Sequence, residues 1–172
     1  MRILVCDSSK TGFTRRYAVW TAQALGAERM DFSEVTPEKM AKFDTIIYGG
    51  GLYEGKVNGL KQARNMFLES GARRLILFAT GATPNAAEDA VKKQWAYNLR
   101  GEEIPHVYMQ AGLCYEKMPL PDKLLMKLFA GFLEREQEKS PERAAFQHSM
   151  KASFDITDRN FILPLLRLAK EE

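Results

Sequence analysis

Five short β-type segments alternate along this chain with longer segments of helical periodicity, and this alternation constrains the fold most. The strand-like runs cover residues 2–6, 28–32, 45–48, 75–79 and 104–109. Between them, apolar residues recur three or four positions apart in residues 14–25, 37–42, 57–70 and 85–99. Parallel strands need right-handed crossovers, and the crossover helices must cover both faces of the sheet. The alternation therefore predicts an α/β fold with a doubly wound, five-stranded parallel sheet.

Several helix boundaries can also be read from local chemistry. We expect Gly26 and Gly71 to end helices, since glycine favours the left-handed position after a last helical turn. Asn85 with Glu88 has the spacing of a capping box. A final helix is expected to begin at Thr157 or Asp158 and to restart at the proline at position 164.

The segment after the fifth strand is too long for a simple connection. No further strand is indicated between Gly112 and Phe154, and a structureless stretch of this length is uncommon in a compact domain. We expect residues 113–154 to form a helical insertion. Within it, an amphipathic helix should begin near Asp122, with the leucines at 124, 125 and 128 on one face. The whole chain, residues 1–172, is expected to be a single domain.

Composition excludes several classes of protein. With 172 residues, 45% hydrophobic and 27% charged, the chain has a globular composition. Its 25 basic and 22 acidic residues are mixed, so no nucleic-acid partner is expected. No apolar stretch reaches the ~20 residues of a membrane span and no signal sequence is visible, which predicts a cytoplasmic protein. Cys6 and Cys114 lack metal-ligand spacing, so neither a disulfide framework nor a metal is expected.

A hydroxyl-rich turn follows the first strand and leads directly into a helix. It reads Ser8-Ser9-Lys10-Thr11-Gly12-Phe13-Thr14. Such a turn directs backbone N–H groups, hydroxyls and the positive end of a helix at one phosphate. Helix capping alone would need fewer hydroxyls than these. The turn therefore predicts a phosphate-binding loop.

The third and fourth strands end in small residues, and ligands of doubly wound sheets bind beyond such ends. Three glycines, Gly49 to Gly51, allow positive φ and let a planar ligand approach the main chain, with Leu52 and Tyr53 covering a ring. Thr80, Gly81 and Ala82 follow the fourth strand and suit the other side of a crevice.

The pattern Ser9-x-Thr11-Gly12-x-Thr14 resembles the phosphate loop of flavodoxins. The resemblance covers nearly the whole chain and implies a flavodoxin-like fold with strand order 2-1-3-4-5. It also implies FMN as the cofactor, since the loop suits one terminal phosphate and nothing suits a second phosphate or an adenine. The cofactor-binding residues expected on this basis are Ser9, Lys10, Thr11, Gly12, Phe13, Thr14, Gly50, Gly51, Leu52, Tyr53, Thr80, Gly81 and Ala82.

A narrower resemblance lies in the insertion. Gly112-Leu113-Cys114-Tyr115 and the residues at 120–127 resemble the segment typical of quinone-dependent protoporphyrinogen dehydrogenases. This implies an FMN-dependent dehydrogenase with a porphyrinogen substrate and a quinone acceptor. It leaves open a peripheral contact with the inner face of the membrane, at most. The alternative is a flavodoxin-type electron carrier that docks on partner redox proteins.

Other features separate these two readings. Flavodoxin carriers are strongly acidic, whereas the net charge of this chain is +3. Trp20 and Trp95 fall inside predicted helices and are expected to pack there, which leaves Tyr53 for ring contact. Both features favour the enzyme over the carrier. No side chain stands out as a general acid or base, and the sequence does not indicate an oligomeric state.

Three phosphate chemistries on similar folds are not favoured. Gly50-x4-Gly55-Lys56 resembles a nucleotidase loop, but Val57 replaces the required Ser or Thr. A thiol phosphatase using Cys6 would need an arginine where Gly12 stands. A phospho-receiver would need an aspartate in place of Gly49.

Overall fold

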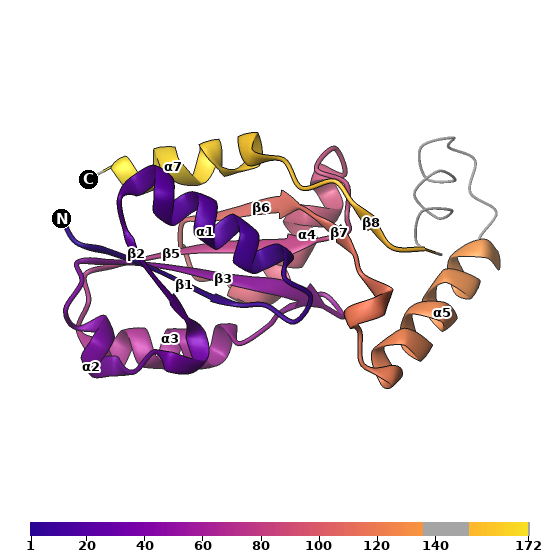
Figure 1. Cartoon of the computed structure of the whole chain (residues 1–172), viewed down its shortest axis with the longest axis horizontal. Coiled ribbons are helices and arrows are strands. Elements are labelled where there is room, and N and C mark those ends of the chain that lie inside the picture. The colour runs from indigo at the N-terminus through magenta and orange to yellow at the C-terminus, as the bar shows by residue number, and fades with distance from the viewer. Residues whose placement is uncertain (136–151, 172) are drawn as a thin grey trace.

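A sheet of five parallel strands forms the centre of the molecule. The structure is a computed structural model, and it describes residues 1–135 and 152–171. The strands are β1 (Ile3–Ser8), β2 (Glu28–Asp31), β3 (Thr45–Tyr53), β5 (Arg74–Gly81) and β6 (His106–Gln110). They lie in the order β2-β1-β3-β5-β6 (Figure 1). Counted along the chain, this is the expected order 2-1-3-4-5. The predicted doubly wound sheet is confirmed.

Helices cover both faces of this sheet. α1 (Phe13–Leu25) and α7 (Leu163–Lys170) pack on one face, and α2 (Pro37–Met40), α3 (Leu60–Ser70) and α4 (Glu88–Leu99) pack on the other. Successive residues of a strand point to opposite faces. Ile46 and Tyr48 of β3 accordingly belong to the core beneath α2, α3 and α4, while Ile47 belongs to the core beneath α1 and α7. All three are fully buried, which explains the continuous apolar runs of the central strands.

Strand β3 is longer than expected. It passes through the three glycines to Tyr53 and turns back into β4 (Lys56–Val57), which pairs with it in antiparallel fashion. The expectation of positive φ at Gly49 to Gly51 is wrong, because all three glycines lie in the ladder with β1 and β5 and none has positive φ.

The physical role of these glycines is close packing. A Cβ atom on Gly49 would lie 1.9 Å from Cζ of Phe78 in the neighbouring strand. A Cβ atom on Gly50 would point to the other face and lie 2.6 Å from the carbonyl oxygen of Asn58. The absence of side chains therefore lets β3 pass between an aromatic ring and the returning turn after β4.

Two helix boundaries differ from the expectation. α3 begins at Leu60, after Gly59 in the left-handed region, because Val57 belongs to β4. α4 begins at Glu88 without a side-chain cap. The capping box at Asn85 is wrong: the Asn85 side chain accepts from the N–H of Gln110, whose side-chain oxygen accepts from the N–H of Asn85, both at 3.0 Å. Asn85 therefore joins the end of β6 to the loop after β5.

The final helical segment follows the expectation. Asp158 accepts a hydrogen bond from the N–H of Asn160 at 2.8 Å and begins a short 3-10 helix, η3 (Arg159–Ile162). α7 follows directly, with Pro164 in its first turn. Another 3-10 helix, η1 (Phe32–Glu34), joins β2 to α2.

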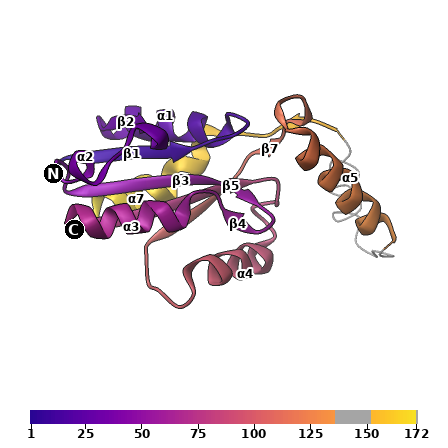
Figure 2. The ribbon, with the colours of Figure 1, turned by 90° about the horizontal axis from the view of Figure 1, so that it is seen from below.

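The segment after β6 contains one expected and one unexpected feature. A helix is present as α5 (Leu120–Arg135), and it projects away from the sheet (Figure 2). The expectation of no further strand is wrong, because β7 (Gly112–Leu113) pairs with β8 (Phe154–Asp155). Pairs this short have no periodicity to read. A Cβ atom on Gly112 would lie 2.1 Å from the carbonyl oxygen of Phe154, so glycine is needed for this close approach. Residues 136–151 of the predicted insertion lie outside the described residues.

Among the described helices, none is both long and apolar enough to cross a membrane. Both termini lie at the end of the molecule opposite α5 (Figure 1). The carboxyl ends of the parallel strands therefore face the segment that contains β7, α5 and a third 3-10 helix, η2 (Tyr115–Lys117).

Replacing Gly49 by alanine should destabilise the protein, because the new methyl group would overlap the Phe78 ring. Overpacking of this kind costs about 1–3 kcal/mol, which urea unfolding would measure. Gly51→Ala is the matched control in the same strand, since its Cβ atom would lie 3.4 Å from Oγ1 of Thr14, an ordinary contact. Equal loss of stability in both variants would contradict the packing role of Gly49.

Candidate functional site

A cavity of about 470 Å³ opens at the carboxyl ends of the central strands. Most of the residues that line it belong to four groups: the loop from β1 to α1, the turn between β3 and β4, the loop after β5, and the segment from β7 to α5. Asn58, Gln94 and Ala111 line it in addition. The first three groups are the loops that the sequence pattern singles out. The fourth belongs to the predicted helical insertion, and none of its residues is among those predicted to bind the cofactor.

Most of the residues predicted to bind a cofactor meet in this cavity. Those that line it are Lys10, Thr11, Phe13, Thr14, Gly51, Leu52, Tyr53, Thr80, Gly81 and Ala82. They come from three separate parts of the chain, and the parallel sheet brings them together. Their role in binding stays a prediction.

Ser9, Gly12 and Gly50 do not line the cavity. The hydroxyl of Ser9 accepts a hydrogen bond from the N–H of Gly12 at 3.0 Å, and Gly12 has a φ of +99° just before α1. These two residues therefore set the shape of the loop. Gly50 lies within the ladder of β3, so of the three consecutive glycines only Gly51 borders the cavity.

The amino end of α1 points a set of donors at the cavity. The first N–H groups of a helix have no carbonyl partner within it. α1 begins at Phe13 with no side-chain cap and no acidic residue in its first turn. The dipole of a helix end with such free donors attracts an anion. Thr11 and Thr14 border the cavity at this end.

Two buried hydroxyls lie side by side here. Oγ1 of Thr14 and Oγ1 of Thr80 are 2.8 Å apart, which links α1 to the end of β5. Each hydroxyl has one proton to donate, and one bond between them uses only one of the two. One hydroxyl proton of the pair remains for a ligand oxygen.

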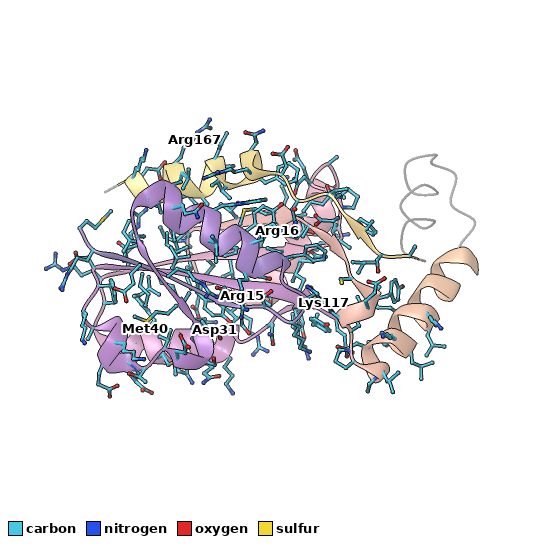
Figure 3. All side chains as sticks on the ribbon, in the orientation of Figure 1. Arg15, Arg16, Asp31, Met40, Lys117 and Arg167 are labelled. Carbon is cyan, nitrogen blue, oxygen red and sulfur yellow. The ribbon has the colours of Figure 1, made fainter. Side chains whose placement is uncertain are left out.

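Lys10 carries the only cation among the described residues that line the cavity. Its ammonium lies 3.8 Å from the centre of the Tyr53 ring and 3.7 Å from Oδ2 of Asp122, in the first turn of α5. A second ammonium reaches the same loop from η2, where Nζ of Lys117 lies 3.7 Å from the position of a Cβ atom on Gly12 (Figure 3). The loop before α1 is thus the cationic end of the cavity.

Three buried polar atoms of residues that line the cavity have no hydrogen-bond partner among the described residues. They are Oη of Tyr53, Oε1 of Gln94 and Oδ2 of Asp122. Burial, and after it the neighbouring Asp122 carboxylate, raises the pKa of Tyr53 to about 12, so its hydroxyl stays protonated at neutral pH. The Tyr53 hydroxyl and the Asp122 carboxylate act on each other, and Asp122 also pairs with Lys10. Because unpaired buried polar groups are uncommon, the Gln94 oxygen is the atom that indicates a place for a ligand donor.

Much of the rest of the lining is apolar, although Glu54, Asn58 and Thr83 also contribute polar groups. Leu52 and Tyr53 supply one wall, and Leu113, Met118 and Met126 come from the segment between β7 and α5. Trp20 and Trp95 stay within α1 and α4 and do not border the cavity, as predicted. The cavity therefore joins a polar, cationic end to an apolar chamber.

Sequence reasoning missed three polar contributors. Asn58 donates to the hydroxyl of Ser8 at 2.8 Å, and its own N–H donates to the carbonyl of Gly51 at 2.9 Å. Gln94 donates to the hydroxyl of Thr83 at 3.1 Å. Asp122 was visible only as a residue that begins a helix. None of the three belongs to a local motif, since each reaches the cavity through the fold.

A buried ion pair fixes the strand that leads into the loop. Asp7 is fully buried, and its Oδ1 accepts from Nε and Nη2 of Arg29 at 2.8 and 2.5 Å. Burial raises the pKa of Asp7, and the hydrogen bond and charge of Arg29 oppose that rise. Arg15 of α1 lies 4.0 Å from Asp7 and pairs with Asp31 at 2.5 Å (Figure 3). This network ties β1, β2 and α1 together behind the loop that joins β1 to α1.

The thiol of Cys6 lies in the same strand and is fully buried. Burial raises its pKa far above the usual range of a thiol, which leaves it protonated and unreactive. This agrees with the exclusion of a thiol phosphatase. Within residues 1–135 and 152–171, no three His, Cys, Asp or Glu residues gather as they would around a metal ion.

A parallel α/β sheet with order 2-1-3-4-5 and a cavity at its carboxyl edge defines the class of flavodoxin-like proteins. Comparison with protein families matches residues 4–150 to the Flavodoxin domain. The chain therefore belongs to the flavodoxin-domain family. No curated protein gives a significant match.

Several solved structures are similar to this chain at low sequence identity. A flavodoxin from the domain Archaea is 13% identical, with 88% of this chain and 100% of that chain covered and a TM-score of 0.43. Oxidised Flavodoxin 2 from Bacillus cereus is 13% identical, with 88% and 98% covered and a TM-score of 0.45. The Trp repressor binding protein from Bacillus subtilis is 12% identical, with 81% and 100% covered and a TM-score of 0.46.

Proposed function

We propose that this protein binds FMN in the cavity and works as a flavin-dependent oxidoreductase. One observation carries the proposal: the uncapped amino end of α1, the Thr14–Thr80 hydroxyl pair and the Lys10 ammonium meet at one end of a single, otherwise largely apolar cavity. That arrangement suits a molecule with one phosphate and one large ring system. Membership of the flavodoxin-domain family supports the same ligand.

The polar end of the cavity fits a phosphate monoester. Thr11, Thr14 and Lys10 would hold it, together with the first N–H groups of α1. Hydroxyl, ammonium and backbone N–H donors can bind a phosphate group without contacting the rest of the ligand. The N–H of Gly12 already donates to Ser9, so it is not part of the proposed donor set.

The wider end of the cavity fits a ring with polar edges. Tyr53 and Leu52 present flat or apolar surfaces, and the unpaired atoms of Gln94 and Tyr53 offer an acceptor and a hydroxyl. When bound, the flavin would supply the redox chemistry. The side chains of this protein hold, orient and shield it, and no side chain is assigned as a general acid or base.

Replacing Thr11 and Thr14 together by alanine should weaken FMN binding by about 100-fold, because two hydrogen bonds to a charged group are lost. Riboflavin lacks the phosphate and should bind the variant as it binds the wild type. Quenching of flavin fluorescence would measure both dissociation constants. The matched control is Thr36→Ala, since Thr36 caps α2 far along the chain from the loop. Because Thr14 is buried and its replacement could also affect folding, Thr11→Ala alone is the second variant. Equal losses of affinity for FMN and riboflavin would contradict the proposed phosphate site.

We further propose that the reaction is dehydrogenation of a porphyrinogen-like substrate with a quinone as acceptor. The resemblance of residues 112–127 to the quinone-dependent dehydrogenases suggests these reactants. The apolar lining from Met118, Leu125 and Met126 supports it, because an apolar surface suits the faces of such planar reactants. The alternative, an electron carrier that docks on partner proteins, would not need that chamber.

Leu125→Glu should separate the two functions, because Leu125 lines the cavity and is partly exposed. A carboxylate there should lower porphyrinogen oxidation by about tenfold or more, because it places a charge in the apolar part of the lining and so disfavours an apolar substrate. FMN affinity should stay unchanged. Leu128→Glu is the control, on the same helix but outside the lining. The assay uses FMN-loaded protein and a water-soluble quinone; a wild-type protein that binds FMN and oxidises no porphyrinogen would favour the carrier.

A peripheral membrane contact through α5 is also part of the proposal. Leu120, Leu124 and Leu128 are 80%, 61% and 65% exposed, and Lys123 and Lys127 lie beside them in the helix. An apolar stripe flanked by lysines favours binding at an anionic lipid surface. Such a contact would bring the cavity close to a quinone dissolved in the bilayer.

The variant Leu120→Glu/Leu124→Glu should lose sedimentation with vesicles that contain anionic phospholipid, because the apolar stripe would carry two negative charges. Leu68→Glu is the control, an equally exposed leucine on α3. Sedimentation of the wild type with anionic but not neutral vesicles supports the contact. Equal sedimentation of the wild type and the double variant would exclude α5 as its source.

A further inference from the structure

Lys10 belongs to the phosphate-binding loop, but its ammonium contacts two other segments. It lies over the ring of Tyr53 at the end of β3 and 3.7 Å from Oδ2 of Asp122 in α5. All three side chains line the same cavity. The cation that a ligand phosphate would need is therefore already paired with a carboxylate.

This pairing is weak compared with what a phosphate could offer. The Lys10 and Asp122 side chains are 44% and 23% exposed, and ion pairs of this length near solvent contribute little. A phosphate monoester carries a charge of about −1.5 to −2 at neutral pH and offers three acceptor oxygens. A phosphate at the amino end of α1 would thus compete effectively for Lys10.

We infer that Asp122 is a specificity-determining residue: it competes with the ligand's phosphate for Lys10 and so limits how strongly the site prefers a phosphorylated flavin. This inference rests on the proposed FMN site. Phosphate binding moves the ammonium from Asp122 to the ligand, and the Asp122 carboxylate is left beside Tyr53. The free energy of the Lys10–Asp122 contact then makes the binding free energy of FMN less favourable, and it leaves that of riboflavin unchanged.

The test is a double-mutant cycle on two ligands. Asp122→Asn should tighten FMN binding by about fivefold, because the competing charge is removed. Lys10→Met should weaken FMN binding by about tenfold or more, because a charged donor is lost. In the double variant the gain from Asp122→Asn should vanish. Riboflavin affinity should change less than about twofold throughout. Flavin fluorescence quenching measures all eight constants.

Glu54→Gln distinguishes exchange of Lys10 from simple repulsion between negative charges. Glu54 also lines the cavity and makes no ion pair with Lys10 among the described residues. Under the inference, Glu54→Gln changes FMN affinity by less than Asp122→Asn does. A gain that persists in the Lys10→Met background, or an equal gain in Glu54→Gln, would overturn it. So would weaker FMN binding by Asp122→Asn. Failure of the wild type to bind FMN would overturn the proposed function as well, whereas these other outcomes leave that function intact.

Discussion

The contact between the hydroxyls of Thr14 and Thr80 holds the amino end of α1 against the carboxyl end of β5. Both residues are almost fully buried, so the contact cannot be replaced by water without opening the core. Gly51 lies beside the same hydroxyl: a Cβ atom on Gly51 would lie 3.4 Å from Oγ1 of Thr14. Phe13 and Thr14, at the amino end of α1, accordingly line the cavity together with Gly51 and Thr80.

The Asp7–Arg29 pair fixes the start of the loop, as the Thr14–Thr80 contact fixes its end. It joins the ends of β1 and β2, and Arg15 extends the network to α1. Removing one partner of a buried pair leaves an uncompensated charge, which typically costs about 3–5 kcal/mol. The loop that follows is therefore fixed at both ends, by an ion network at β1 and by a hydroxyl pair at α1. The proposed phosphate site would need this rigidity, because backbone N–H donors cannot reorient individually.

Patterns of local sequence predicted the sheet, because periodicity acts over a few neighbouring residues, and the resemblance to flavodoxins supplied its strand order. The phosphate-binding role of the loop after β1 stays a prediction. Gly49 to Gly51 show where this reasoning fails. Gly49 and Gly50 are needed because of the Phe78 ring and the turn after β4, which local periodicity does not reveal, so a rule about positive φ gave the wrong reason. The capping box predicted at Asn85 was wrong for a similar reason, since its partner Gln110 is 25 residues away. Asp122 entered the site only because the segment after β6 turns back over the cavity.

The two ends of the cavity come from parts of the chain with different physical demands. The polar end is built on β1, α1 and β5, elements buried in one continuous core that holds their donors in place. The apolar end is completed by β7, η2 and α5, which pack in a small separate cluster around Leu113 and Met118. A smaller core resists displacement less than a large one. Contacts between the two parts, such as Lys10 with Asp122, therefore join the loop before α1, which rests on the large core, to α5, which rests on the small one.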